Sequence, residues 1–131
     1  MQLSDRILFI DDDAIIIDKP AGLPVESPKR GGDSVVSGAS ELRCGMDLDP
    51  VPVHRLDQEI SGCLLLARNR DDRVKLCQAL ENEAVVKYFI AVVDTEVADE
   101  EGMIDMPLAK QSKPEEAWRT IVTDKGAGAV T

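Results

Sequence analysis

The residues that could do chemistry gather in one short stretch, "VPVHRLDQEISGCLLLARN", at positions 51–69. It contains the only histidine of the chain, His54, followed by Arg55 and Asp57. Asp57 has the chemistry of a nucleophile or a general base, and Arg55 that of an anion-binding group. Side chains alternate along an extended segment, so Arg55 and Asp57 are predicted to point to the same side. The alternative is an exposed loop in which the two form an ion pair that contributes little.

Two other kinds of site are conceivable in the same stretch. Asp57 and Glu59 could be the paired carboxylates of a glycosidase, which lie roughly 5 Å apart in retaining enzymes and roughly 6.5–9.5 Å apart in inverting ones. Nothing in the sequence sets either distance, and the aromatic residues that line sugar sites are scarce. His54 has no carboxylate or cysteine at ligand spacing, so a structural hydrogen-bonding role is favoured over metal binding.

The composition is that of a globular chain with an aliphatic core. Its 131 residues make one domain or part of one, with 44% apolar but only 3% aromatic residues. The formal net charge of −10 argues, taken alone, against nucleic acid as a partner, because phosphate contacts need clustered Lys and Arg. No stretch is long enough to span a membrane and no signal-peptide pattern opens the chain, so a cytoplasmic location is expected.

The three cysteines, Cys44, Cys63 and Cys77, share no metal-ligand spacing. An odd, scattered set also argues against a disulfide framework. Cys63 lies in an apolar run and Cys77 in a helical pattern, so both are predicted to be buried thiols.

The first third of the chain predicts a β-hairpin followed by a long loop. Two apolar runs, residues 7–10 and 14–17, flank three aspartates at positions 11–13. The aspartates favour a solvated turn over a metal site, since no calcium-loop spacing follows them. Residues 19–50 are rich in Pro, Gly and Ser and predict a loop, with one helical turn around residues 34–42.

The remaining segments predict a central strand, a helix and further strands. The run "CLLLA" at 63–67 is continuously apolar, as in a buried central strand. A helix follows, capped by Asn69 or Asp71, with its apolar stripe at Val74, Cys77, Leu80 and Ala84. Further strands are predicted at residues 84–93 and 117–123, and a short extended piece at 103–109. The expected fold is α+β, with a mixed, mainly antiparallel sheet, few helices, and Asp57 in a cleft.

Five motifs follow one another in an order that resembles a known family. They are "ILFIDDDAIIIDKPAGLPV", "VHRLDQEISGCLLLARN", "VVKYFIAVV", "GMIDMPLA" and "KGAGAVT". Together they cover nearly the whole chain and resemble the RluA-type RNA pseudouridine synthases. The most specific part is "HRLD" followed by "SG" and an apolar run, whereas "DKPAG" and "KYFIAVV" are moderately specific.

The resemblance implies an enzyme that isomerises uridine in ribosomal or transfer RNA to pseudouridine, without a metal or organic cofactor. The N-glycosidic bond breaks and the sugar rejoins the base at C5. Asp57 would be the catalytic carboxylate, acting by nucleophilic attack or by proton removal. Tyr88 would stack on the detached uracil or assist proton transfer, and Arg55 would help to hold the flipped-out nucleotide.

Other residues of these motifs are expected to be structural. Lys19, Pro20 and Gly22 of "DKPAG" predict a turn after the strand, and Ser61 and Gly62 a turn that presents Asp57. Without the resemblance, Tyr88 would be interpreted as a core or edge-strand tyrosine with a satisfied hydroxyl group.

The chain departs from the family's pattern in two places. Ile60 stands where the family has threonine, and the family's "GRTHQIRxH"-like segment, with the basic partner of the aspartate, is absent. Residues 1–131 are therefore expected to be the N-terminal part of a single, truncated pseudouridine synthase catalytic domain. An alternative function is an inactive fragment or paralogue that serves as a binding or scaffold module. Missing strands would expose a sheet edge, through which self-association is predicted.

Overall fold

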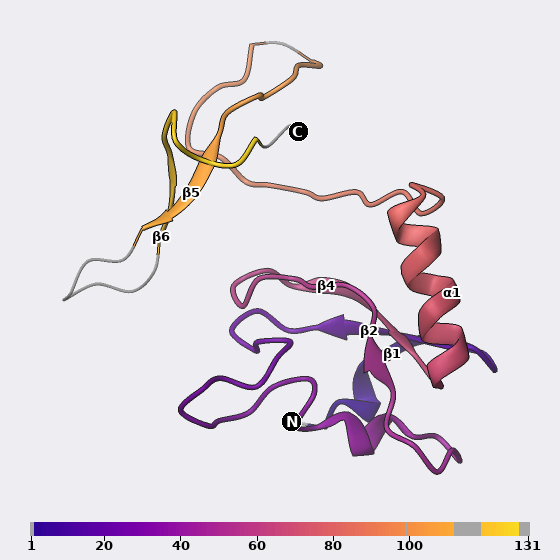
Figure 1. The fold of residues 1–131 in the computed structure, drawn as a ribbon. Coiled ribbons are helices and arrows are strands. Elements are labelled where there is room, and N and C mark those ends of the chain that lie inside the picture. The colour runs from indigo at the N-terminus through magenta and orange to yellow at the C-terminus, as the bar shows by residue number, and fades with distance from the viewer. Residues whose placement is uncertain (1, 99, 112–118, 129–131) are drawn as a thin grey trace. The chain divides into compact units, whose positions relative to one another are not determined.

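The computed structural model describes residues 2–98, 100–111 and 119–128, which divide into two compact units. The first unit is Met1–Tyr88 and the second is Phe89–Thr131. In the first, a four-stranded antiparallel sheet has the strand order β1-β2-β4-β3 (Figure 1). Its strands are β1 (Ile7–Ile10), β2 (Ala14–Lys19), β3 (Val51–Pro52) and β4 (Gly62–Ala67). The expected α+β class with a mainly antiparallel sheet is confirmed.

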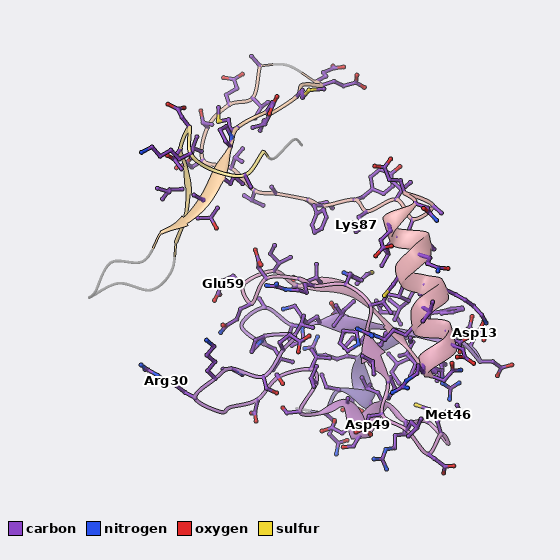
Figure 2. All side chains as sticks on the ribbon, in the orientation of Figure 1. Asp13, Arg30, Met46, Asp49, Glu59 and Lys87 are labelled. Carbon is purple, nitrogen blue, oxygen red and sulfur yellow. The ribbon has the colours of Figure 1, made fainter. Side chains whose placement is uncertain are left out.

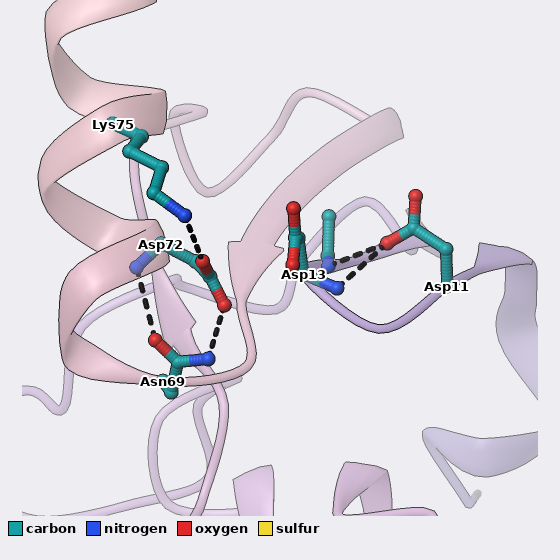
Figure 3. Close-up of polar contacts among 6 residues, drawn as sticks. Asp11, Asp13, Asn69, Asp72 and Lys75 are labelled. Carbon is teal, nitrogen blue, oxygen red and sulfur yellow. Dashed lines mark hydrogen bonds and ion pairs between the residues drawn. The ribbon is translucent and has the colours of Figure 1, made fainter.

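The predicted hairpin is formed by β1 and β2, and the acidic turn between them is stabilised by one of its own aspartates. The Asp11 carboxylate accepts the backbone N–H groups of Asp13, at 3.0 Å, and Ala14, at 2.8 Å (Figure 3). Aspartate at the start of a turn commonly accepts such bonds. The turn that was predicted from the three aspartates is therefore stabilised by hydrogen bonds from its backbone to the Asp11 side chain.

The core lies between the sheet and the loop that follows β2. Ile15 and Ile17 of β2 are paired with Leu66 and Leu64 of β4, and all four side chains are fully buried. Val25, Val35 and Leu42 of the loop pack against them, the last in a short 3-10 helix, η2 (Ala39–Leu42). Another 3-10 helix, η1 (Ser4–Arg6), precedes β1. The predictions of a central strand at 63–67 and of a helical turn within 34–42 are confirmed.

Helix α1 (Arg70–Glu81) begins where its sequence predicts. Asn69 is the N-cap, and its side-chain oxygen accepts the backbone N–H of Asp72 at 2.9 Å (Figure 3). The Asn69 amide in turn donates to the Asp72 carboxylate, which also binds Lys75 at 3.0 Å. Asp72 is buried in this arrangement, and such an acid in the first helical turn also suits the helix dipole.

Several details of the predicted burial were wrong. Cys63 is exposed, because side chains alternate along β4 and Cys63 lies on the face opposite Leu64 and Leu66. Val74 is also exposed, and so is Ala84, which lies beyond the end of α1. Cys77 and Leu80 of the predicted stripe are partly buried, together with Leu76. The Cys77 thiol lies 3.8 Å from the Val53 carbonyl oxygen. The partly buried face of α1 is thus rotated relative to the predicted apolar stripe.

The predicted strand at residues 84–93 is absent. The backbone there forms no ladder, and its apolar side chains are exposed, to 99% for both Ile90 and Val92. A strand is completed by hydrogen bonds to a neighbour, and none of the described strands lies beside this segment. The β propensity of residues 84–93 is therefore not sufficient to form a strand without a neighbouring strand.

The second unit contains a two-stranded antiparallel sheet of β5 (Leu108–Gln111) and β6 (Arg119–Val122). The predicted extended piece and the later strand overlap these elements, although Ala117 and Trp118 lie outside the described residues. Ala127 exchanges two backbone hydrogen bonds of 2.8 Å with Leu108. A Cβ atom on Gly126 would come within 2.5 Å of the Leu108 backbone, so this approach requires glycine.

At the edge of the first sheet, β1 exposes three large apolar side chains, those of Leu8, Phe9 and Ile10. This is an edge of the kind through which self-association was predicted, and that association stays a prediction. No helix in the described ranges is long and apolar enough to cross a lipid bilayer.

Candidate active site

Asp57 lies in a tight turn between β3 and β4. The Ile60 backbone N–H donates to the Asp57 carbonyl oxygen at 3.1 Å, which closes the turn over residues 57–60. The Asp57 side chain is exposed. Gly62 has a φ of +119° where β4 begins, a conformation that favours glycine. This supports the structural role that was predicted for Gly62.

The turn is joined to the loop of the "DKPAG" motif. The Gly22 backbone N–H donates to the Gln58 carbonyl oxygen at 2.8 Å, and the Gln58 side-chain amide donates back to the Gly22 carbonyl at 3.0 Å. Gly22 itself has a φ of +87°. Figure 2 shows this turn, labelled at Glu59, at the opposite end of the sheet from Asp13. The structural role predicted for "DKPAG" thus extends to the turn that carries Asp57.

Lys19 is fully buried at this junction, whereas the sequence pattern predicted only a turn here. Its ammonium group donates to the carbonyl oxygens of Pro20 (3.0 Å), Leu23 (2.8 Å) and Gln58 (3.2 Å). Burial lowers the pKa of Lys19, while the nearby charges of Glu59 and Asp57 act in the opposite direction. One signal was available, since Lys19 follows Ile15 and Ile17 at the two-residue spacing of an inward-facing strand side.

His54 has the structural role that its isolation in the sequence predicted. Its Nε2 atom accepts the Leu65 backbone N–H at 3.1 Å, so the proton of the neutral ring is on Nδ1, which lies 3.4 Å from the Arg55 carbonyl oxygen. The bond between His54 and Leu65 holds the segment that precedes the Asp57 turn against β4. Burial lowers the pKa of His54 below its ordinary value of 6.5, against a smaller raising effect of the Arg55 carbonyl.

We expect His54 to titrate below pH 6.5 in the folded protein. Because the fold favours the neutral ring, the unfolded chain binds a proton more readily, and the free energy of unfolding should decrease as the pH falls below about 6.5. The chain has one histidine, so a proton NMR titration of its Cε1–H reads this group alone. A midpoint at or above 6.5 would contradict the assigned hydrogen bond.

Among the described residues, neither Arg55 nor Tyr88 forms a hydrogen bond or an ion pair with Asp57. Arg55 is exposed, and the ion pairs found among the described residues do not include Arg55 with Asp57. Tyr88 lies in the unpaired segment after α1 and is 90% exposed. The predicted contributions of both residues to the site therefore rest on the sequence pattern, whereas Asp57 has a defined structural setting.

A shallow hollow of the first unit lies elsewhere. Its lining comes from the N-terminal segment, η1, β1 and β2, namely Gln2, Asp5, Arg6, Ile7, Leu8 and Asp18. Asp57 does not line this hollow, and its side chain is exposed on a turn, so the expected cleft around Asp57 stays a prediction. Within the same residues, no three His, Cys, Asp or Glu side chains are grouped as metal ligands would be.

Comparison with known proteins shows the family to which the chain belongs. The family profile described as RNA pseudouridylate synthase matches residues 13–129. The chain belongs to that family, and the resemblance to its RluA-type members is confirmed. An uncharacterised RNA pseudouridine synthase of Zymomonas mobilis is 46% identical over 129 residues, which are 98% of this chain and 59% of that protein.

Relatives with assigned names are more distant. Ribosomal large subunit pseudouridine synthase D of Nitrosomonas europaea is 32% identical, across 96% of this chain and 37% of its own length. tRNA pseudouridine synthase C of Haemophilus ducreyi is 35% identical over 102 residues, 78% of this chain and 42% of that protein. The chain thus spans well under two thirds of the length of these relatives.

A solved structure supports the fold. Human RNA pseudouridylate synthase domain containing 4 superposes with a TM-score of 0.67, covering 98% of this chain and 52% of the human chain. The identity of 21% makes this a likeness of fold.

Proposed function

We propose that this protein is an RNA pseudouridine synthase that isomerises uridine in ribosomal or transfer RNA, with Asp57 as its catalytic carboxylate. The observation that carries the proposal is the setting of Asp57, an exposed carboxylate on a turn anchored by Gly22, Gln58 and Lys19. Membership of the family supports the reaction class, and the ribosomal and transfer RNA synthases among its relatives support the choice of substrate.

The chemistry assigned to Asp57 is that of a nucleophile or a base. As a nucleophile, the carboxylate attacks the ribose or the base, and it leaves again when the new bond forms. The N1–C1′ bond breaks, a C5–C1′ bond forms, and the hydrogen on C5 is lost as a proton while N1 gains one. Exposure suits this role, because a nucleotide within RNA must reach the carboxylate from solvent.

Substrate access requires the target uridine to leave its stack, since its reacting atoms are covered inside a helix. In this proposal Arg55, exposed two residues before Asp57, helps to hold the flipped-out nucleotide through its phosphate or sugar. Tyr88 stacks on the detached uracil or assists proton transfer. Its 90% exposure supports an available ring, and stacking on aromatic side chains is a common way to hold a base.

Part of the negative charge of the chain lies far from the turn that carries Asp57. Asp11 to Asp13 and Asp72 lie at the other end of the sheet, where β2 begins and α1 starts (Figure 2). RNA approaching the turn at residues 57–60 therefore meets a weaker field than the net charge of −10 suggests. In this proposal the chain is the N-terminal part of one catalytic domain, which the family match across both units supports.

A second candidate is an inactive module that binds RNA or a protein without turnover. The observation that favours it is that neither Arg55 nor Tyr88 forms an ion pair or a hydrogen bond with Asp57 among the described residues. Both candidates present the same exposed turn, and they differ in whether C5 of uridine loses its hydrogen.

The experiment that tests the proposed function is tritium release from RNA labelled at C5 of uridine. The protein is incubated with unmodified ribosomal and transfer RNA transcripts, because either class is a proposed substrate. We expect tritium release from at least one transcript, together with pseudouridine in its digest. RNA binding in a filter assay without any release would instead support the inactive module.

A further inference from the structure

The Lys19 side chain is buried, where its positive charge is energetically unfavourable. It is fully buried, and no carboxylate of the described residues lies within ion-pair distance of its nitrogen. An ammonium group has three protons to donate, and here each has a carbonyl acceptor. Burial of an unpaired charge is unfavourable even when its hydrogen bonds are complete, so an apolar residue would suit this inward-facing position at lower cost.

The three acceptors of Lys19 come from two loops that are distant in sequence. Pro20 and Leu23 belong to the loop after β2, whereas Gln58 follows Asp57 directly in its turn. The Gln58 carbonyl oxygen accepts a second bond, from Gly22, so one peptide group is held from two directions. The peptide group between Gln58 and Glu59, one residue after Asp57, is therefore tied to the end of β2 and the loop that follows it.

We propose that Lys19 is a positioning residue for Asp57. Its ammonium group clamps the turn at residues 57–60 to the loop after β2 and so presents the Asp57 carboxylate in one orientation. The inference rests on the proposed function of Asp57 as the catalytic carboxylate. A displacement of reacting groups by about 1 Å can reduce a rate by about 10²-fold, so loosening this clamp should slow the chemical step.

Arg68 provides a matched control at the other end of the same sheet. Its guanidinium is also buried and donates to three carbonyl oxygens, those of Asp11 (2.5 Å), Cys44 (3.1 Å) and Arg43 (3.4 Å). None of these belongs to the Asp57 turn, and Arg68 follows the end of β4 that pairs with Ala14 rather than with Lys19. Its removal should perturb the fold without releasing the turn.

The test compares Lys19→Met with Arg68→Met, at a temperature where circular dichroism shows both variants folded. For Lys19→Met we expect kcat for tritium release to fall about 10²-fold while KM stays within about threefold. Amide hydrogen exchange at Gly22 and Ile60 should become faster, because these N–H groups hold the turn. For Arg68→Met, kcat and both exchange rates should stay within about threefold of wild type even though stability decreases.

The inference is overturned if Lys19→Met keeps the wild-type kcat, or if Arg68→Met loses kcat to the same extent. Should Lys19→Met not fold, Lys19→Gln keeps a donor on the side chain and is measured in its place. If neither variant folds, Lys19 supports the whole fold and the positioning role is rejected. Absence of tritium release from the wild-type protein would refute the proposed function itself, whereas the exchange rates would still report on the clamp.

Discussion

Replacement of Asp57 by asparagine should reduce tritium release from uridine-labelled RNA by about 10³-fold or more, because the amide is neither a nucleophile nor a base. Asparagine has nearly the same shape as aspartate. The Asp57 side chain is exposed, and the turn is closed by the Ile60 N–H on the Asp57 backbone carbonyl rather than by the carboxylate, so the turn should persist. Release is measured under single-turnover conditions with excess protein, so that weaker RNA binding does not hide the chemical step.

The control for this variant is Glu59→Gln, which removes an exposed carboxylate two residues away in the same turn. It lowers the local negative charge by the same amount, and we expect release to stay within about threefold of wild type. Equal losses in both variants would show that the turn needs a carboxylate pair or its overall charge. Full activity of Asp57→Asn would exclude Asp57 as the catalytic group.

Replacement of Leu64 by alanine should lower the free energy of unfolding of the first unit by about 3 kcal/mol. Leu64 is fully buried in the central strand β4, opposite Ile17 of β2. Truncation leaves a cavity between the sheet and the loop that packs on it, and β4 cannot move to fill this cavity without breaking its hydrogen bonds to β2. Native-state hydrogen exchange of the β2 amides measures this unit by itself, which matters because the chain has two units.

Leu48→Ala is the matched control, because Leu48 is 64% exposed in the loop before β3. The same chemical change there should alter the free energy of unfolding by less than about 0.5 kcal/mol. Equal effects at the two positions would mean that β4 is not the centre of the core.

Some features could be predicted from the sequence because their causes are local. The hairpin of β1 and β2 follows from two apolar runs around a turn whose Asp11 binds its own backbone. Helix α1 begins at an asparagine that caps it, and the run at 63–67 is apolar enough to be a central strand. The motif "HRLD" also marked the residue that the structure places on an anchored, exposed turn. Each of these signals lies within a few residues of what it determines.

Other features were decided by contacts between segments far apart in the chain. Residues 84–93 have strong β propensity, yet a strand also needs a neighbour, and none of the described strands provides one. Lys19 is charged and was expected in a turn, but the carbonyl of Gln58, 39 residues away, gives its ammonium group a third acceptor in the interior. Composition and spacing carry no information about such a partner. The sequence by itself thus determined the local elements and pointed to Asp57 as the proposed reactive residue, and only the tertiary structure decided which loop holds that residue in place.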